Sequence, residues 1–433
     1  MIKIIPVALF FLSFFASLVS NAILRKISNK FNVLLDNPDK KRKFHKNPTP
    51  LTGGIGISIG IIFSGIFLFF LTDNNYDVDI STENFVNSQE NTIKENTNIH
   101  EIKISDQTGI KIKVIDDESF LMILPDGEKK MYKVSNNSKR QNILTQEAYI
   151  DPILISNFSI GLLFFTIILQ LIMLIDDMWG LKEINKLFFQ SFCVLGVIYV
   201  SDIYIVSLGN LLGLGNIELG LFGIPFTVFC VVGMINAFNY IDGLNGLCAS
   251  FCLICFASII FMINAHSIPS LFPLILPVGA IMGFLIYNLG ILGDQRNVFL
   301  GDNGSQALGF LCAWVLVYFS QYEDSDFSPV TSLWLVAILF IDALRVLSSR
   351  ALRGLKGSKI LEAKRDHVYH KLQDFGFSSE ATFCLLILMS SLFSAIGIMF
   401  NRLFITDHYY SFYAFLLTWI IFHIFINKIP KNV

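Results

Sequence analysis

The amino-acid sequence predicts an all-α polytopic membrane protein, with about 11 transmembrane helices and a small extracytoplasmic β-rich insertion. Three observations predict this class. Long apolar runs recur along the chain, and Lys and Arg gather in alternate connecting segments. Charged residues make up only 15% of the chain, whereas soluble proteins carry about 25%. This composition excludes an ordinary soluble enzyme, and the net charge of -2 predicts no nucleic-acid partner.

Apolar runs of roughly 20 residues are long enough to cross a bilayer as helices. Arg25, Lys26 and Lys30 follow the first run, which favours a retained anchor with its N-terminus outside over a cleaved signal peptide. In this orientation the short segments rich in Lys and Arg lie in the cytoplasm, together with the C-terminus. The candidate spans are residues 3–24, 51–72, 152–175, 187–206, 222–241, 244–264, 271–289, 306–321, 330–347, 383–400 and 409–428.

Residues 73–150 are polar and follow a span that leads outward, so we expect them outside the membrane. Their first part is rich in Asn, Asp, Glu, Ser and Thr and is typical of a linker. Further on, Ile110, Ile112 and Val114 alternate with lysines, and a Pro125-Asp126-Gly127 turn separates two apolar runs. This pattern predicts strands and a hairpin. An unstructured polar loop is the alternative.

The chain therefore divides into three expected parts. Residues 1–72 form the first two membrane helices and the first cytoplasmic loop, and residues 73–150 form the insertion. Residues 151–433 form the third to eleventh membrane helices with the catalytic loops. The seven cysteines all lie in or beside apolar spans, where buried Cys acts as a small apolar residue, so we expect no disulfide framework and no cysteine metal site.

Four clusters of polar residues stand at the cytoplasmic ends of these spans, where charged side chains are costly and therefore usually functional. Asp176 and Asp177 form the first, with Lys186 after them. Adjacent carboxylates suit a divalent metal or a proton transfer, because they repel each other unless a cation lies between them. A solvated helix terminus is the alternative for an isolated Asp-Asp pair.

The second cluster places Asn236, Asn239 and Asp242 at intervals of three residues, on one face of a helix. Oxygen-bearing side chains so arranged bind a hard cation or a metal–phosphate complex. Asn245 follows between two glycines, which let the backbone approach a ligand. Hydrogen bonding between membrane helices is the alternative.

The third cluster is a Gly-Asp-x-Gly-Ser turn around Asp302 that opens a helix. It presents backbone N–H groups beside one carboxylate, which suits a metal-bound diphosphate. Phe299, just before it, could stack on a base or belong to the core. The fourth cluster, in the last long cytoplasmic loop, includes Arg365, His367 and His370. Arginine binds phosphate bidentately, although such a loop also suits contact with anionic lipid.

The first cytoplasmic loop adds a fifth motif, a basic stretch bounded by prolines that contains Arg42, His45 and Lys46.

Together, these five motifs resemble the polyprenyl-phosphate N-acetylhexosamine-1-phosphate transferase family (glycosyltransferase family 4). They follow the family's order over roughly residues 35–375. His45 with its two following prolines, and the late Arg-Asp-His-x-x-His segment, are most similar to the bacterial undecaprenyl-phosphate GlcNAc-1-phosphate transferase branch.

The resemblance implies transfer of an N-acetylhexosamine-1-phosphate, GlcNAc-1-phosphate above all, from a UDP-sugar to undecaprenyl phosphate, releasing UMP. This step would initiate a cell-envelope glycan such as lipopolysaccharide O-antigen. It also implies Mg²⁺ (or Mn²⁺), a bacterial inner-membrane location and a homodimer. The implied catalytic residues are Asp176, Asp177, Asp242 and Asp302, and the implied metal ligands are Asp302, Asn239 and Asp176. Nucleotide-sugar binding falls to Lys186, Asn236, Asn245, Phe299, Arg365, His367 and His370, and lipid-phosphate binding to Arg42, His45 and Lys46.

The chain departs from the family at three places. Asn245 replaces the usual bacterial Asp, as in eukaryotic relatives, so we expect activity to be retained. The usual His-x-His-His segment ends here in Tyr369-His370, so another UDP-N-acetyl sugar is an alternative donor. The 73–150 insertion has no counterpart, and we expect it to bind an envelope or glycan-assembly partner. Competing hypotheses are a phospho-MurNAc-pentapeptide translocase, a membrane prenyltransferase, a secondary transporter and a non-catalytic scaffold.

Overall fold

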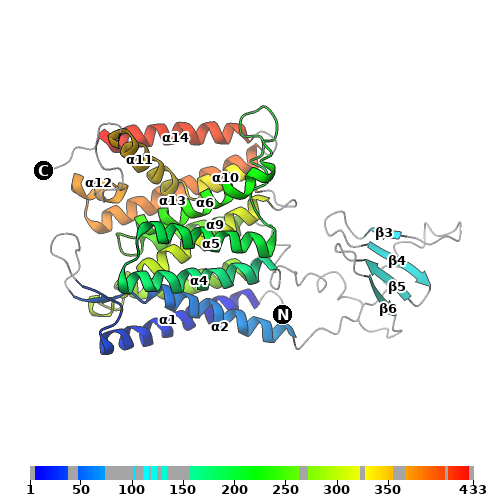
Figure 1. Ribbon diagram of the computed structural model, residues 1–433, viewed down its shortest axis with the longest axis horizontal. Helices are drawn as coiled ribbons and strands as arrows, with labels where there is room; N and C mark the ends of the chain where they lie inside the picture. Colours follow the sequence, from blue (N-terminus) through cyan, green and yellow to red (C-terminus); the bar gives the residue numbers. More distant parts are fainter. Residues whose placement is uncertain are drawn as a thin grey trace. The chain divides into compact units, whose positions relative to one another are not determined.

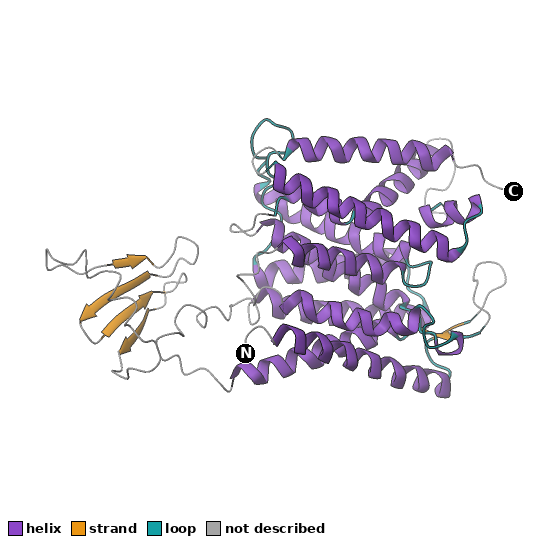
Figure 2. Ribbon diagram, turned by 180° about the vertical axis from the view of Figure 1, so that it is seen from behind, coloured by secondary structure: helices purple, strands orange, loops and turns teal. Residues whose placement is uncertain are grey.

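The computed structural model describes residues 5–37, 47–73, 101–103, 111–116, 119–123, 129–133, 157–262, 272–321, 327–354, 366–404 and 408–428. It separates into two compact units. One unit comprises Met1–Leu68 with Pro152–Val433, and the other comprises Phe69–Asp151. The first unit is a bundle of helices, and the second contains strands (Figures 1 and 2).

The second unit contains four strands, and the last three overlap the runs from which the sequence predicts strands. They are β3 (Glu101–Lys103), β4 (Lys111–Asp116), β5 (Ser119–Ile123) and β6 (Lys129–Lys133). Each strand pairs antiparallel with the next, in the order β3-β4-β5-β6. The predicted Pro-Asp-Gly turn falls between β5 and β6, as expected for a hairpin connection. The location of this unit outside the membrane stays a prediction.

The helical unit is built mainly from long apolar helices. In chain order the helices are α1 (Ile5–Phe31), α2 (Gly53–Asp73), α4 (Asn157–Trp179), α5 (Glu183–Ser201), α6 (Gly223–Ile241), α7 (Leu247–Met262), α8 (Phe272–Asn288), α9 (Gly301–Gln321), α10 (Pro329–Leu335), α11 (Ala337–Gly354), α12 (Val368–Phe375), α13 (Ser379–Leu403) and α14 (Tyr409–Lys428). The short strands β1 (Leu35–Asp36) and β2 (Thr49–Pro50) pair between α1 and α2. The prediction of a polytopic all-α membrane protein is confirmed.

The expected count of about eleven spans is not supported. Within the described ranges, six helices are long and apolar enough to cross a membrane, or up to seven if α10 and α11, bent by 84°, form one span. The described part of α2, with α7 and α8, forms shorter apolar helices. Sequence hydropathy counts such helices as spans because it measures apolar character and not the length of the helix that forms.

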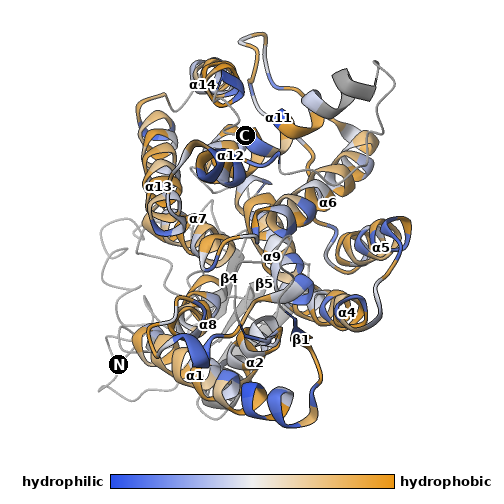
Figure 3. Ribbon diagram, turned by 90° about the vertical axis from the view of Figure 1, so that its left-hand side faces the viewer, coloured by the Kyte–Doolittle hydropathy of each residue, from blue (hydrophilic) through white to orange (hydrophobic). Residues whose placement is uncertain are grey.

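Helix α9 lies in the middle of the bundle and is packed against α4, α6 and α7 (Figure 3). Most of its side chains are buried. At Gly309 an added Cβ would lie 2.9 Å from Ile235 Cα, so the absence of a side chain there lets the backbones of α9 and α6 approach closely. Because α9 is central, its neighbouring helices can bring polar side chains to its N-terminus.

The ends of the motif-bearing helices meet at one end of the bundle. Helices α4, α6 and α8 end there, and short connections lead directly into α5, α7 and α9. This end, which we call the motif end, lies at the left in Figure 1 and faces the viewer in Figure 3. Helix α1 begins at the opposite end, and α14 ends at the motif end (Figure 1). The two ends of the chain therefore lead to opposite ends of the bundle.

Candidate active site

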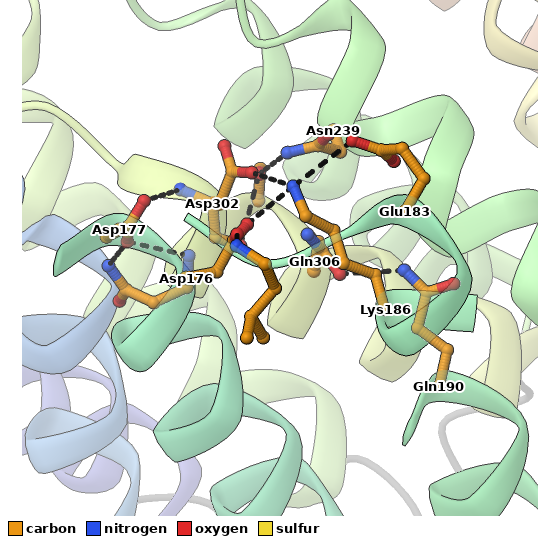
Figure 4. Close-up of polar contacts among 11 residues, drawn as sticks. Asp176, Asp177, Glu183, Lys186, Gln190, Asn239, Asp302 and Gln306 are labelled. Atoms are coloured by element: carbon orange, nitrogen blue, oxygen red, sulfur yellow. Dashed lines mark hydrogen bonds and ion pairs between the residues drawn. The ribbon is translucent and has the colours of Figure 1, made fainter. Parts of the chain in front are cut away.

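Asp177 joins the end of α4 to the beginning of α9. Its two carboxylate oxygens accept hydrogen bonds from the backbone N–H of Asp302, at 3.0 Å, and of Asn303, at 3.1 Å. The Asn303 side-chain amide also donates to Asp177, at 2.6 Å. Figure 4 shows this carboxylate at the first turn of α9. A carboxylate in this position satisfies the free N–H groups of a helix N-terminus and complements its dipole.

Asp176, the adjacent residue, faces a different neighbour. One of its oxygens accepts a hydrogen bond from Leu181 N, at 2.6 Å, which closes the turn after α4. The other lies 2.6 Å from Lys186 Nζ, on the first turns of α5. Lys186 Nζ also lies 3.5 Å from a carboxylate oxygen of Asp302 (Figure 4). Lys186 therefore bridges the carboxylates of two separate motifs.

The amides of the second motif form a network below these carboxylates. Asn239 donates to the Ser305 hydroxyl at 3.1 Å and so lies beside Asp302. Asn236 lies one turn earlier on α6 and donates to Gln190 Oε1 at 2.8 Å. Gln190 in turn donates to Gln306 Oε1 at 2.8 Å. Asn236 thus belongs to a hydrogen-bonded chain that joins α5, α6 and α9, which was the alternative interpretation of this motif.

The roles of Gln306 and Asn303 were not predicted from the sequence. Both are buried. The available signal was position, because Gln306 follows Asp302 by four residues and so occupies the same face of α9. A buried amide at that place needs hydrogen-bond partners, and it finds one in Gln190.

Asp242 caps the end of α6. Burial raises the pKa of its carboxyl well above the ordinary value, and the nearby charges of Asp302 and Asp177 raise it further. Asp242 of the second motif is therefore close enough to the third motif for the charge of Asp302 to act on it. Asn288 connects them as well, because its side chain accepts from Gly246 N and donates to Val298 O at 2.8 Å. Asn245 lies exposed in the turn between α6 and α7.

The first loop pairs with the chain just before α9. Phe299 N donates to Pro50 O at 2.8 Å, and Gly53 N donates to Phe299 O at 2.9 Å. A Cβ added at Gly54 would lie 2.3 Å from Gly304 Cα, so the N-termini of α2 and α9 are in backbone contact. The Phe299 side chain, expected against a nucleobase, is partly buried at this junction.

Part of the fourth motif lies against the second. His367 stands beside Tyr240 near the end of α6, with 5.5 Å between the ring centroids. The Tyr369 hydroxyl occupies the space that a Cβ at Gly243 would fill. His370 follows on the first turn of α12. The predicted residues Arg42, His45, Lys46 and Arg365 lie outside the described residues.

The donor set near Lys186 suits a hard cation. Two carboxylates, from Asp176 and Asp302, share its ammonium group, and the Asn239 amide is adjacent. Mg²⁺ prefers oxygen ligands, and it usually takes one or two protein carboxylates together with substrate phosphates. In the part of the chain that the structure describes, no group of three His, Cys, Asp or Glu residues forms a complete metal cage. The residues thus fit an ion that is shared with a substrate.

Known proteins support this interpretation of the motifs. Residues 159–320, from α4 to α9, match the model of glycosyl transferase family 4. This segment contains the carboxylate cluster described above. This part of the chain is similar to glycosyl transferase family 4. The resemblance predicted from the motifs is thereby confirmed, whereas the first loop and the His367 segment lie outside the matched residues.

Several bacterial proteins are similar to this protein over more than half of its length. It is 29% identical over 249 residues to the undecaprenyl-phosphate α-N-acetylglucosaminyl 1-phosphate transferase of Yersinia pestis, covering 57% of this chain and 67% of the relative. The protein of the same name from Escherichia coli K12 is 29% identical over 259 residues, covering 59% and 70%. That of Haemophilus influenzae is 30% identical over 239 residues, covering 55% and 66%.

Proposed function

We propose that this protein transfers N-acetylhexosamine-1-phosphate, most simply GlcNAc-1-phosphate, from a UDP-sugar to undecaprenyl phosphate and releases UMP. The observation that carries the proposal is the convergence of Asp176, Lys186, Asn239 and Asp302 at the motif end. The names of the relatives support the polyprenyl acceptor and the sugar-1-phosphate. The initiated product would be a cell-envelope glycan.

In the proposed reaction, an anionic oxygen of the lipid phosphate attacks the sugar-bearing phosphorus of the UDP-sugar. The bond from that phosphorus to the bridging oxygen breaks, and UMP leaves with the bridging oxygen. Phosphoryl transfer depends mainly on positioning and on neutralisation of charge. Mg²⁺, or Mn²⁺ in its place, would supply that neutralisation at the diphosphate, held by Asp302, Asn239 and Asp176.

The protein's own residues have distinct proposed roles. Lys186 binds a diphosphate oxygen, and this contact would replace part of its pairing with Asp176 and Asp302. Asp177 keeps the first turn of α9 in place and thereby fixes where the Asp302 side chain stands. Asp242 lies close enough to Asp177 and Asp302 for their charges to raise its pKa, which suits a group that holds a proton near the lipid phosphate.

We further propose that the motif end faces the cytoplasm of a bacterial inner membrane, because UDP-sugars and the Lys- and Arg-rich loops belong on that side. The N-terminus and residues 73–150 would then lie outside. The insertion would bind an envelope or glycan-assembly partner, and the protein would act as a homodimer.

The decisive experiment is UMP release by the purified protein with undecaprenyl phosphate and Mg²⁺. The donors are UDP-GlcNAc, UDP-GalNAc, UDP-QuiNAc and UDP-MurNAc-pentapeptide, each also assayed with EDTA and with the Asp302→Asn variant. We expect UMP from one donor, abolished by EDTA and in the variant. Folded protein that releases no UMP from any donor, with the lipid accessible, would refute the proposal.

The same panel tests the second candidate function. Tyr369 stands where the family motif has His and its hydroxyl contacts the Asp242-Gly243 turn, which favours a donor with a different N-acetyl sugar. UMP from UDP-GalNAc or UDP-QuiNAc alone would support this variant. UMP from UDP-MurNAc-pentapeptide alone would identify a pentapeptide translocase instead.

A further inference from the structure

A buried group of charges lies behind His367. Asp342 and Arg345 are one turn apart on α11, and both are almost fully buried, at 2% and 1% exposure. One oxygen of Asp342 accepts from Arg345 Nη2 at 2.7 Å and from Val368 N at 3.1 Å. The other oxygen lies 2.9 Å from His367 Nδ1. The Asp342 carboxylate therefore links α11, through Arg345, to the chain segment His367–Val368.

The charge of Asp342 is already balanced without His367. Arg345 forms a second contact with Asp342 through Nε, at 3.2 Å. It also donates to the backbone carbonyl of Asp366 and lies 3.5 Å from Asn427 Oδ1 on α14. Buried charges persist in proteins when they are paired and hydrogen-bonded in this way. A neutral His367 leaves the group uncharged, and a protonated His367 gives it one positive charge.

The contact with Asp342 also decides which edge of the imidazole is available. A carboxylate is only an acceptor, so His367 Nδ1 must carry the proton of this hydrogen bond. Nε2, the ring nitrogen that does not face Asp342, is then the unprotonated nitrogen of the neutral ring. The ring lies beside Tyr240, with the two ring planes tilted by 34°, and Tyr240 precedes Asp242 by two residues. Tyr369, two residues after His367, rests on Gly243.

We propose that Asp342 is a positioning residue, which fixes His367 in the Nδ1–H form and thereby presents Nε2 to the phosphate or sugar of the donor at the Asp242 turn. The proposal rests on the proposed transferase function. Asp342 touches no substrate in this arrangement and acts only through His367. Nε2 can accept a hydrogen bond from a hydroxyl of the sugar, or it can take a proton from solvent water and donate it in a hydrogen bond to a phosphate oxygen, with the Asp342 carboxylate opposite the resulting positive charge.

Two substitutions separate this role from a structural one. Asp342→Asn is nearly isosteric, but its amide N–H would donate to Nδ1 and favour the opposite tautomer. We expect UMP release to fall on the order of 100-fold, as for loss of one acid–base group. His367→Gln should lose a similar amount. The double variant should lose no more than either alone, since the two residues would act as one unit. The control is Glu380→Gln, which removes an exposed carboxylate at the start of α13 and should leave the rate unchanged.

The tautomer itself can be read without any activity assay. In protein labelled with ¹⁵N-histidine, and with His367→Gln to assign the signal, the Nε2 resonance of neutral His367 should be of the unprotonated, pyridine type. It should change to the protonated, pyrrole type in Asp342→Asn. If Asp342→Asn does not fold, the wild-type spectrum alone decides, because a protonated Nε2 in neutral His367 would overturn the proposal.

The outcomes distinguish this inference from the proposed function. Additive losses in the double variant would overturn the positioning role and assign Asp342 a structural one. An unchanged tautomer in a folded, impaired Asp342→Asn would overturn it as well. If the wild-type protein releases no UMP from any donor, the transferase proposal fails, while the ¹⁵N result still reports whether Asp342 sets the His367 tautomer.

Discussion

Two groups of charges at the motif end differ in their balance. Around Lys186, the carboxylates of Asp176 and Asp302 share one ammonium group, and the Asp302 side chain is 38% exposed. Around Asp342, a single carboxylate meets an arginine, and both side chains are only 2% exposed. The first group has an excess of negative charge and is open to solvent, and the second is neutral and closed.

The difference separates a group of charges that is ready to bind a ligand from one that supports a neighbouring residue. An accessible excess of carboxylates is costly unless a cation neutralises it, so the first group is prepared for an ion and a phosphate. A buried, balanced pair needs nothing further, and removing one partner leaves an uncompensated charge. Substitutions in the first group should therefore change activity with little effect on stability, whereas loss of a charge from the buried pair should lower stability, and at Asp342 it should lower activity as well.

The largest effect is expected at Asp302. Asp302→Asn should lower the rate of UMP release on the order of 1,000-fold, because it removes a proposed metal ligand. It should leave the free energy of unfolding unchanged or slightly higher, since one of the repelling carboxylates is gone. Glu183→Gln is the matched control, because Glu183 also contacts Lys186, at 3.6 Å, but is 77% exposed. A similar loss in both variants would contradict the comparison.

Arg345→Met should have the largest effect on stability. It leaves Asp342 buried without its cation, and we expect the free energy of unfolding to fall by about 3–5 kcal/mol. Chemical denaturation in detergent measures this change, with Asp302→Asn as the reference. A variant as stable as the wild type would show that the Asp342 group is not a closed structural pair.

Substitutions at the adjacent residues Asp176 and Asp177 should differ in how they change the Mg²⁺ dependence of the reaction. Asp176→Asn should strongly raise the Mg²⁺ concentration for half-maximal activity, whereas Asp177→Asn should raise it much less, because Asp177 acts only through the position of Asp302. Asp177→Asn should instead lower stability by about 1 kcal/mol, the usual value of a helix cap. Titrations of UMP release with Mg²⁺ make this comparison. Equal shifts in both variants would place Asp177 among the metal ligands.

The smallest effect is expected from the insertion. Replacing residues 73–150 with a short Gly/Ser linker should leave the rate per folded protein unchanged, because α2 ends and α4 begins at the end of the bundle opposite the motif end (Figure 1). The measurement is UMP release from membranes that contain equal amounts of inserted protein. Loss of activity in a correctly inserted deletion would show that the insertion takes part in the reaction.

The residue types of the site were predictable from the sequence, but their individual partners were not. Hydropathy and the one-sided motifs identify Asp176, Asp242 and Asp302 as unusual. They do not distinguish Asp176 from Asp177, because adjacent residues on a helix point about 100° apart and so meet different neighbours. Which neighbour each meets depends on how α4 packs against α5 and α9.

The same limit applies to the amides and to the spans. Asn236 and Asn239 share a helical face, yet only Asn239 lies beside Ser305 and the Asp302 turn. Asn236 is one turn deeper, where Gln190 lies. Among the described residues, fewer than eleven helices are long enough to span a membrane, partly because the described part of α2 and helices α7 and α8 are apolar but short. Periodicity alone does not fix where a helix ends.

The backbone contact between α2 and α9 has a mechanical consequence. Pro50 and Gly53 exchange hydrogen bonds with Phe299, and Gly54 abuts Gly304 without an intervening side chain. A joint made of main-chain atoms has no side chains that could rearrange to absorb a shift. A displacement of residues 49–54 would therefore be passed through main-chain contacts to the turn that carries the Asp302 carboxylate.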